Sequence, residues 1–172
     1  MQNYFELFDL ETSFFIDEAV LKRSYQVEIS RFHPDNFATK SEPEKLQALQ
    51  NTSLLNSAYR ALKTPLTRAT YLLKLEGMDA FDEKDTVMEK GFLISQIELR
   101  DKLEDIEEKK DSLGLDDFIE RIDSFIEEKI ELISEAYNLS SDQQVIKMHV
   151  RELKFFDKLY KEANSVSGCG GI

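Results

Sequence analysis

Apolar residues recur three and four positions apart along almost the whole chain, and this periodicity constrains the fold more than any other feature. Such spacing places apolar side chains on one face of a helix, whereas a half-buried strand alternates with a period of two. No stretch of the sequence shows that alternation. Gly, Pro and Asn interrupt the pattern and predict where helices end. The sequence therefore predicts an all-α protein.

These interruptions divide the chain into a series of expected helices. In the first half, we expect a short helix in NYFELFD, a longer one from the candidate N-cap Asp17 to residue 32, and two more over residues 44–63 and 66–77. The second half predicts long helices over residues 87–110, 116–137 and 142–163. Their connections, DSLGL and NLSSD, are short, which favours antiparallel neighbours in a bundle.

Charge separates the chain into two parts. Residues 1–76 carry 9 Lys and Arg against 10 Asp and Glu, whereas the remainder carries 13 against 24, so most of the net charge of −12 lies in the second half. The acidic stretch MDAFDEKDT joins the two parts and lacks strong periodicity. We therefore expect a first domain at residues 1–76, a linker at 77–86, a three-helix domain at 87–164 and a flexible Gly-rich tail at 165–172.

Composition disfavours several classes of protein. No apolar run approaches the roughly 20 residues that a membrane-spanning helix needs. The negative charge disfavours a nucleic-acid partner, because phosphates are held by excess positive charge. The start MQNYFELFDLE resembles neither a secretory signal nor a transit peptide, and the single cysteine, Cys169, allows no disulfide within the chain. These features predict a cytoplasmic protein with no membrane and no nucleic-acid partner.

Reactive groups of the kind that enzymes use are scarce. The chain has two histidines, His33 and His149, and neither follows a glutamate at the spacing of a di-iron bundle. Cys-x-x-Cys pairs, phosphate-binding Gly loops and nucleophile elbows are missing from the sequence. His149 is expected to be a hydrogen-bonded core residue. We therefore expect no catalytic residue, no metal site and no cofactor; a helical carboxylate metalloenzyme is the alternative if dispersed acids converge in space.

The helix expected at residues 87–110 carries two apolar stripes at about 100° per residue. The stripe expected to face the bundle core comprises Met88, Phe92, Leu99, Leu103 and Ile106. A second group, Leu93, Ile94 and Ile97, lies away from it beside Glu98 and Asp101. Exposed apolar clusters rimmed by charge are typical of interaction sites; the alternative is that a neighbouring helix or the first domain covers this group. On the last helix the expected core stripe is Val145, His149, Phe156, Tyr160 and Ala163, with Phe155 at its edge.

The segment ISRFHPDNF ends the second helix in an unusual way. Pro34 disfavours the helical conformation for His33 and fixes its own φ angle near −65°, so the helix should end there. Helix termination explains neither Asp35 nor the length of the segment that follows. A rigid turn that presents an imidazole and a carboxylate loses little side-chain freedom on binding. We therefore interpret His33, Pro34 and Asp35 as a candidate recognition element.

Several motifs together resemble the J-domain family. They are Tyr4-Phe5 and Leu7 near the start, HPDNF after the second helix, and LNSAYRALKTPLTRATYLL, in which Asn56, Ala58, Tyr59, Leu62, Pro65 and Arg68 match the family's third-helix pattern. In the second half, FLISQIELRDKLEDIEE and RELKFFDKL are similar to the HscB-type co-chaperones of iron–sulfur cluster assembly. A cysteine-rich zinc module does not precede the J-domain motifs, so the resemblance is to the bacterial type.

The resemblance implies a function for each domain. The J-domain would stimulate ATP hydrolysis by a dedicated heat-shock ATPase chaperone of the HscA type, through His33, Pro34 and Asp35 and the cations Lys22, Arg23 and Arg31. The C-terminal domain would bind an IscU-type cluster scaffold through Leu93, Ile94, Ile97, Glu98, Asp101 and Phe155. Asn36 stands where the family often has Lys, which predicts a modest affinity for the chaperone. A J-domain co-chaperone with a different client is the nearest alternative.

Overall fold

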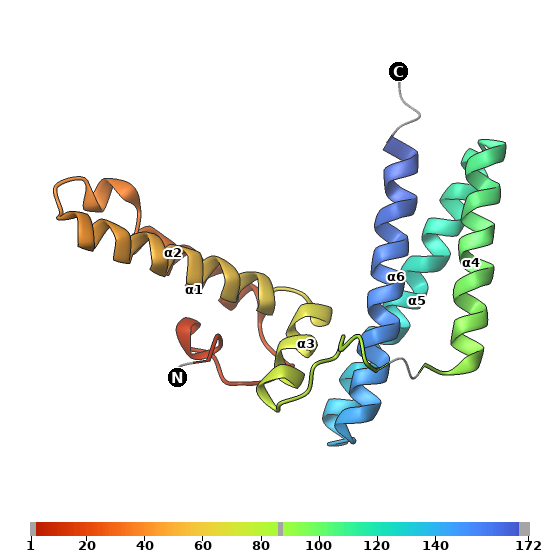
Figure 1. Ribbon diagram of the computed structural model, residues 1–172, viewed down its shortest axis with the longest axis horizontal. Helices are drawn as coiled ribbons and strands as arrows, with labels where there is room; N and C mark the ends of the chain where they lie inside the picture. Colours follow the sequence, from red (N-terminus) through yellow and green to blue (C-terminus); the bar gives the residue numbers. More distant parts are fainter. Residues whose placement is uncertain (1–2, 86–87, 169–172) are drawn as a thin grey trace. The chain divides into compact units, whose positions relative to one another are not determined.

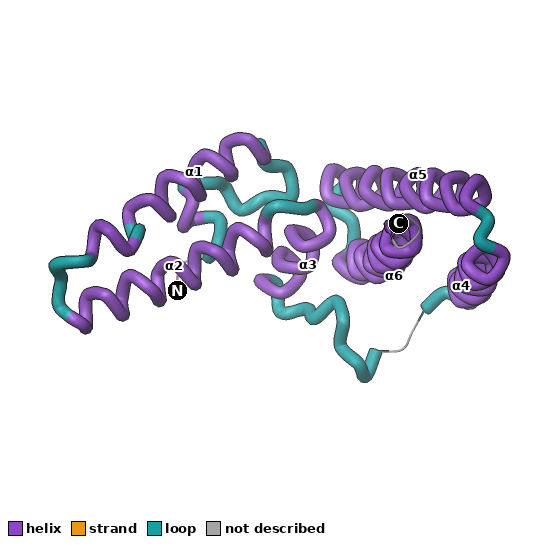
Figure 2. Tube along the Cα trace, turned by 90° about the horizontal axis from the view of Figure 1, so that it is seen from above, coloured by secondary structure: helices purple, strands orange, loops and turns teal. Residues whose placement is uncertain are grey.

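The computed structural model describes residues 3–85 and 88–168 of the chain, and the regular structure of these residues is entirely helical. Figures 1 and 2 show the course of the helices. The chain divides into two compact units, Met1–Met78 and Asp79–Ile172. The expected all-α class is confirmed.

The first unit is built on a helical hairpin. After the 3-10 turn η1 (Glu6–Phe8), α1 (Glu18–Arg31) leads through the 3-10 turn η2 (Pro34–Phe37) into α2 (Glu42–Leu62), and α3 (Pro65–Leu75) follows. Helices α1 and α2 lie side by side, and η2 lies at the tip of their hairpin (Figures 1 and 2). The core between these elements is apolar and contains Phe5, Phe8, Leu21, Leu55, Ala58, Leu62 and Leu73.

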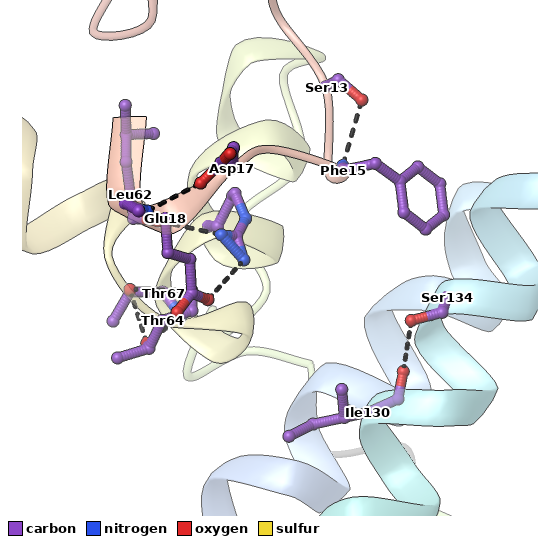
Figure 3. Close-up of polar contacts among 11 residues, drawn as sticks. Ser13, Phe15, Asp17, Glu18, Leu62, Thr64, Thr67, Ile130 and Ser134 are labelled. Atoms are coloured by element: carbon purple, nitrogen blue, oxygen red, sulfur yellow. Dashed lines mark hydrogen bonds and ion pairs between the residues drawn. The ribbon is translucent and has the colours of Figure 1, made fainter. Parts of the chain in front are cut away.

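Side chains at the ends of the helices fix where each one begins. Asp17 accepts hydrogen bonds from the Ala19 and Val20 amides and so caps α1, as the sequence predicts. Ser41 and Glu44 form a capping box, which starts α2 two residues before the predicted position. The Thr64 side chain caps α3 by accepting a hydrogen bond from the Thr67 amide, and Figure 3 shows the hydrogen bond between the Thr64 and Thr67 side chains.

Arg68, a residue of the J-domain motif, ties the ends of three segments together. Its side chain is buried, and it donates to the Leu62 carbonyl at 3.3 Å and to the Glu18 carboxylate at 3.4 Å; Glu18 and Leu62 are labelled in Figure 3. The Arg68 guanidinium also lies 5.4 Å from the centroid of the Phe14 ring. This residue therefore stabilises the first unit rather than contributing to an exposed surface.

Two other motif residues join α1 to α2. The Tyr25 hydroxyl donates a hydrogen bond of 2.6 Å to the Asn56 side chain, and the Tyr25 ring stacks on Tyr59 with 4.2 Å between the ring centroids. Both contacts lie along the body of the hairpin, so Asn56 and Tyr59 fix how the two helices pack.

The second unit consists of three long helices, α4 (Lys90–Lys109), α5 (Ser112–Asn138) and α6 (Gln143–Gly168). Helices α5 and α6 make the most extensive contact, and α4 packs against both. In Figure 2, α4 and α6 are seen nearly end-on and α5 from the side. The buried core between the three is formed by Leu99, Leu103, Ile106, Leu115, Phe118, Ile122, Phe156, Leu159 and Ala163.

Part of the segment expected to be a linker at residues 77–86 packs onto α6. Ala80 is buried, the Asp85 carboxylate pairs with Lys147, and the Lys154 ammonium lies 3.9 Å from the centroid of the Phe81 ring. Residues 79–85 therefore share the packing of the second unit.

Several helix boundaries in the second unit differ from those expected, and α4 begins at Lys90 rather than at residue 87. Helix α5 begins at Ser112 rather than at residue 116, because Asp111 caps it by accepting a 3.0 Å hydrogen bond from the Gly114 amide. Helix α6 runs to Gly168 and so enters the expected flexible tail at 165–172, because Val166 packs against the bundle core. Residues 169–172 of the expected tail, which include Cys169, fall outside the described residues.

Of the five residues predicted for the core stripe of the last helix, two are buried. Phe156 and Ala163 are buried as expected, but Val145 is exposed and His149 and Tyr160 are half-buried. The core positions of α6 are Ile146, Val150, Leu153, Phe156, Leu159 and Ala163. The buried stripe is displaced because α6 packs lengthwise on α5, and this contact cannot be read from α6 alone.

Candidate functional site

The hairpin tip presents His33, Pro34 and Asp35 in a short ordered turn rather than in an open loop. Pro34 occupies the first turn of η2, where a missing amide proton costs nothing. His33 precedes it in an extended conformation, and its Nδ1 accepts a 3.3 Å hydrogen bond from the Asp35 amide. The expected end of the helix before Pro34 is thus confirmed. The His33 side chain then caps the turn that follows, η2.

His33 and Asp35 are both open to solvent. The side chains are 58% and 91% exposed, and His33 Nδ1 lies 3.5 Å from a carboxylate oxygen of Asp35. A ring nitrogen that accepts a hydrogen bond carries no proton, so neutral His33 has its proton on Nε2. The turn can therefore offer one imidazole N–H donor and one carboxylate to a partner.

Asn36 and two aromatic residues hold this turn against α1. The Asn36 side chain donates a 2.9 Å hydrogen bond to the Ser30 carbonyl in the last turn of α1. The rings of Phe32 and Phe37 stack with 6.3 Å between their centroids. These contacts give Asn36 a positioning role that its identity alone does not reveal. In the resemblance to the J-domain family, this position often holds Lys; here it holds Asn36, which bonds to the end of α1.

An apolar hollow of about 550 Å³ lies beside the turn. Its wall includes His33 and Pro34 themselves, with Leu49 and Ala48 on α2 opposite them. Leu49 is 66% exposed, so the apolar surface continues from the hollow onto the outside of α2.

The predicted cations do not form a single patch. Lys22, Arg23 and Arg31 are all exposed on α1. Arg23 and Arg31 lie eight positions apart, on neighbouring faces, whereas Lys22 and Arg31 lie on opposite sides of the helix at about 100° per residue. Arg31 is also paired with Glu28 at 2.8 Å. Arg23 therefore lies between Lys22 and Arg31 around α1 and neighbours both.

The second unit exposes an apolar patch, which we define as Leu93, Ile94, Ile97 and Phe155. On α4, Leu93, Ile94 and Ile97 are 43%, 49% and 63% exposed, whereas Leu99 and Leu103 of the core stripe are buried. The helices of this unit thus leave the second stripe uncovered. Phe155 on α6 is half-buried, and its ring meets Phe92 of α4 edge-to-face at 5.7 Å.

The two acids predicted to rim the patch occupy different positions around α4. Asp101 falls between Leu93 and Ile94 around α4, while Glu98 lies beyond Ile94, on the side facing α5. Glu98 lines a groove between α4 and α5 together with Lys102 and Arg121. Both acids are exposed. Asp101 therefore borders the apolar patch directly, and Glu98 borders it at its outer edge.

His149 does not make the hydrogen bond expected of it. Its Nδ1 is buried without a partner among the described residues. Burial lowers the pKa of His149 below its ordinary value, and the nearby Lys129 ammonium lowers it further, while Glu152 acts in the opposite direction. The side chain is therefore held in its neutral form in the folded protein.

Within residues 3–85 and 88–168, no three His, Cys, Asp or Glu side chains are grouped so as to hold a metal ion. No helix among these residues has the length and apolar character needed to cross a membrane.

Comparison with known proteins decides the family. Residues 88–164 match the family model described as the HSCB C-terminal oligomerisation domain. The whole chain is similar to the chaperone HscB from Vibrio cholerae, with 35% identity, a TM-score of 0.84, and coverage of 97% of this chain and 98% of that one. The chain belongs to the HscB family of co-chaperones.

Two eukaryotic structures extend the comparison. The human co-chaperone HscB is 28% identical with a TM-score of 0.89, and the match covers 97% of this chain and 83% of the human chain. The Jac1 co-chaperone from Saccharomyces cerevisiae is 24% identical with a TM-score of 0.71, covers 95% of this chain and 97% of its own, and shows likeness of fold. HscB proteins are J-domain co-chaperones of iron–sulfur cluster assembly and not a family of enzymes.

Proposed function

We propose that this HscB-family protein is an adaptor without an active site of its own. Its second unit binds an IscU-type iron–sulfur scaffold, and its J-domain delivers the scaffold to an HscA-type heat-shock ATPase and stimulates ATP hydrolysis there. Hydrolysis tightens the grip of the ATPase on the scaffold and so promotes cluster transfer and the maturation of iron–sulfur proteins in the cytoplasm. The cluster is cargo of the scaffold, and the adaptor holds none.

The observation that carries the scaffold half of the proposal is the apolar patch. Leu93, Ile94 and Ile97 are exposed, whereas Leu99, Leu103 and Ile106 on the same helix are buried. Keeping apolar side chains in water lowers the free-energy gain of folding, so a cluster of them at a helix surface is typical of a binding site. The neighbouring ring of Phe155 adds aromatic area, which is enriched at the energetic centres of interfaces.

The hairpin-tip turn supports the ATPase half. Pro34 fixes the backbone, His33 caps the turn and Asn36 anchors it to α1, so the Asp35 carboxylate is presented by a pre-organised segment. A pre-organised, 91% exposed carboxylate loses little conformational entropy when it pairs with a cation of a partner. The cations Lys22, Arg23 and Arg31 on the adjoining helix add positive charge that can pair with an acidic region of the same partner.

Two measurements test the proposal. Isothermal titration of the purified scaffold into this protein should show binding, and the steady-state ATPase rate of the cognate chaperone should rise on addition of this protein, and rise further with scaffold. Stimulation of the ATPase without any scaffold binding would favour the alternative of a different client. No stimulation of the ATPase by the folded protein would refute the adaptor role.

A further inference from the structure

Arg100 lies in the patch region, and neither the motif that contains it nor the proposed function gives it a role. It lies on α4, and its guanidinium reaches across to α6. There its Nη1 donates a 2.9 Å hydrogen bond to the Glu162 carboxylate, and its Cζ lies 5.5 Å from the centroid of the Phe155 ring. A guanidinium within about 6 Å of a ring centroid is attracted by the electrons of the ring.

Its place on α4 puts Arg100 at the edge of the apolar patch. Arg100 follows Ile97 by three positions and Leu93 by seven, so the three side chains share one side of the helix. Phe155 and Glu162 are themselves seven positions apart on α6 and share one face there. The guanidinium therefore lies between the two helices, beside the apolar side chains of one and above the ring of the other.

The Phe155 ring is held from two sides by this arrangement. Phe92 and Phe156 meet it edge-to-face, with ring centroids at 5.7 and 5.5 Å. The Arg100 guanidinium contacts the same ring and is itself tethered by Glu162. An aromatic ring at the edge of a bundle has other rotamers open to it, and these contacts favour the one that places the ring next to the exposed stripe of α4.

We infer that Arg100 is a positioning residue for scaffold binding, which fixes the Phe155 ring as part of the apolar patch. This inference rests on the proposed function, because it assigns a role within the same scaffold-binding surface. The Arg100 and Glu162 side chains are 46% and 41% exposed, so their ion pair adds little to the stability of the fold. The ion pair instead restricts the conformation of the Phe155 ring in the free protein. A ring that is already ordered loses less conformational entropy when the scaffold binds.

A double-mutant cycle on scaffold affinity tests the inference. Arg100→Ala should weaken binding of the purified scaffold about three- to tenfold when Phe155 is present. In the Phe155→Ala background the same substitution should have almost no further effect, because there is no ring left to position. Glu162→Gln, which removes the tether but leaves the guanidinium, should cause a smaller loss than Arg100→Ala.

A spectroscopic measurement separates positioning from direct contact with the partner. With 4-fluorophenylalanine at position 155, the fluorine resonance of the free protein should shift on Arg100→Ala and stay nearly unchanged on Leu113→Ala, an exposed control on α5. Additive losses in the cycle, or full affinity of Arg100→Ala, would overturn the positioning role and leave the proposed function intact. Failure of the unaltered chain to bind the scaffold would overturn the proposed function itself.

Discussion

Truncation of the apolar patch provides a prediction whose size follows from the structure. Leu93 and Ile97 are 43% and 63% exposed in the free protein, and we expect the scaffold to cover this remaining surface. Complete burial of such a side chain is worth about 1.5–3 kcal/mol. Scaled by the two exposed fractions, and reduced for the methyl group that Ala retains, the pair contributes about 1.4–2.7 kcal/mol to binding.

The double variant Leu93→Ala, Ile97→Ala should therefore raise the Kd for the scaffold roughly 10- to 100-fold, which isothermal titration measures directly. Because both side chains are exposed, the substitutions remove few core contacts, and the free energy of unfolding should change by under about 1 kcal/mol. The variant should still stimulate the basal ATPase activity of the chaperone, since the hairpin-tip turn belongs to the other unit.

A matched control is available in the same unit. Leu113 and Leu139 are each 77% exposed, near the two ends of α5, and replacing both with Ala removes more exposed apolar surface than the patch variant does. Scaffold affinity should be unchanged in this control. Equal losses in the two double variants, or an unchanged Kd in a folded patch variant, would refute the assignment of the patch.

Two further predictions concern stability. Arg68→Ala should lower the free energy of unfolding of the first unit by about 2–3 kcal/mol, because the buried guanidinium donates a hydrogen bond to the Leu62 carbonyl. Glu18→Gln should lower it by under about 1 kcal/mol, because Glu18 is exposed. Urea unfolding measures both values, and equal losses would contradict the reasoning. The lowered pKa of His149 means that the unfolded chain binds more protons, so stability should fall as the pH drops through about 6.5, and His149→Gln should reduce that fall. An unaltered pH profile in this variant would contradict the assignment.

Local chemistry determined most of the features that could be predicted from the sequence. The start of α1 at its Asp17 cap and the end of the same helix before Pro34 depend on residues adjacent in the chain, so they can be identified without a structure. The separation of Leu93, Ile94 and Ile97 from the core stripe also follows from one helix. Their exposure does not, because another element could have covered them.

The features that could not be predicted depend on contacts between elements. The core stripe of α6 is set by its packing on α5, which displaced it from the predicted positions. The bond from Asn36 to the Ser30 carbonyl requires the turn to fold back on α1, and the contact of Arg100 with Phe155 and Glu162 requires two helices far apart in sequence to meet. The sequence of α4 does contain a signal for Arg100, since this residue shares a side of the helix with Leu93 and Ile97.

The central claim is that His33, Pro34 and Asp35 switch on the ATPase of a partner, and His33→Gln tests it most directly. The measurement is the steady-state ATPase rate of the cognate chaperone with scaffold present, compared between this protein and the variant at matched concentrations. We predict that the variant loses most of the stimulation while binding the scaffold with unchanged affinity, because the patch is intact. Equal stimulation by the two proteins would contradict the account.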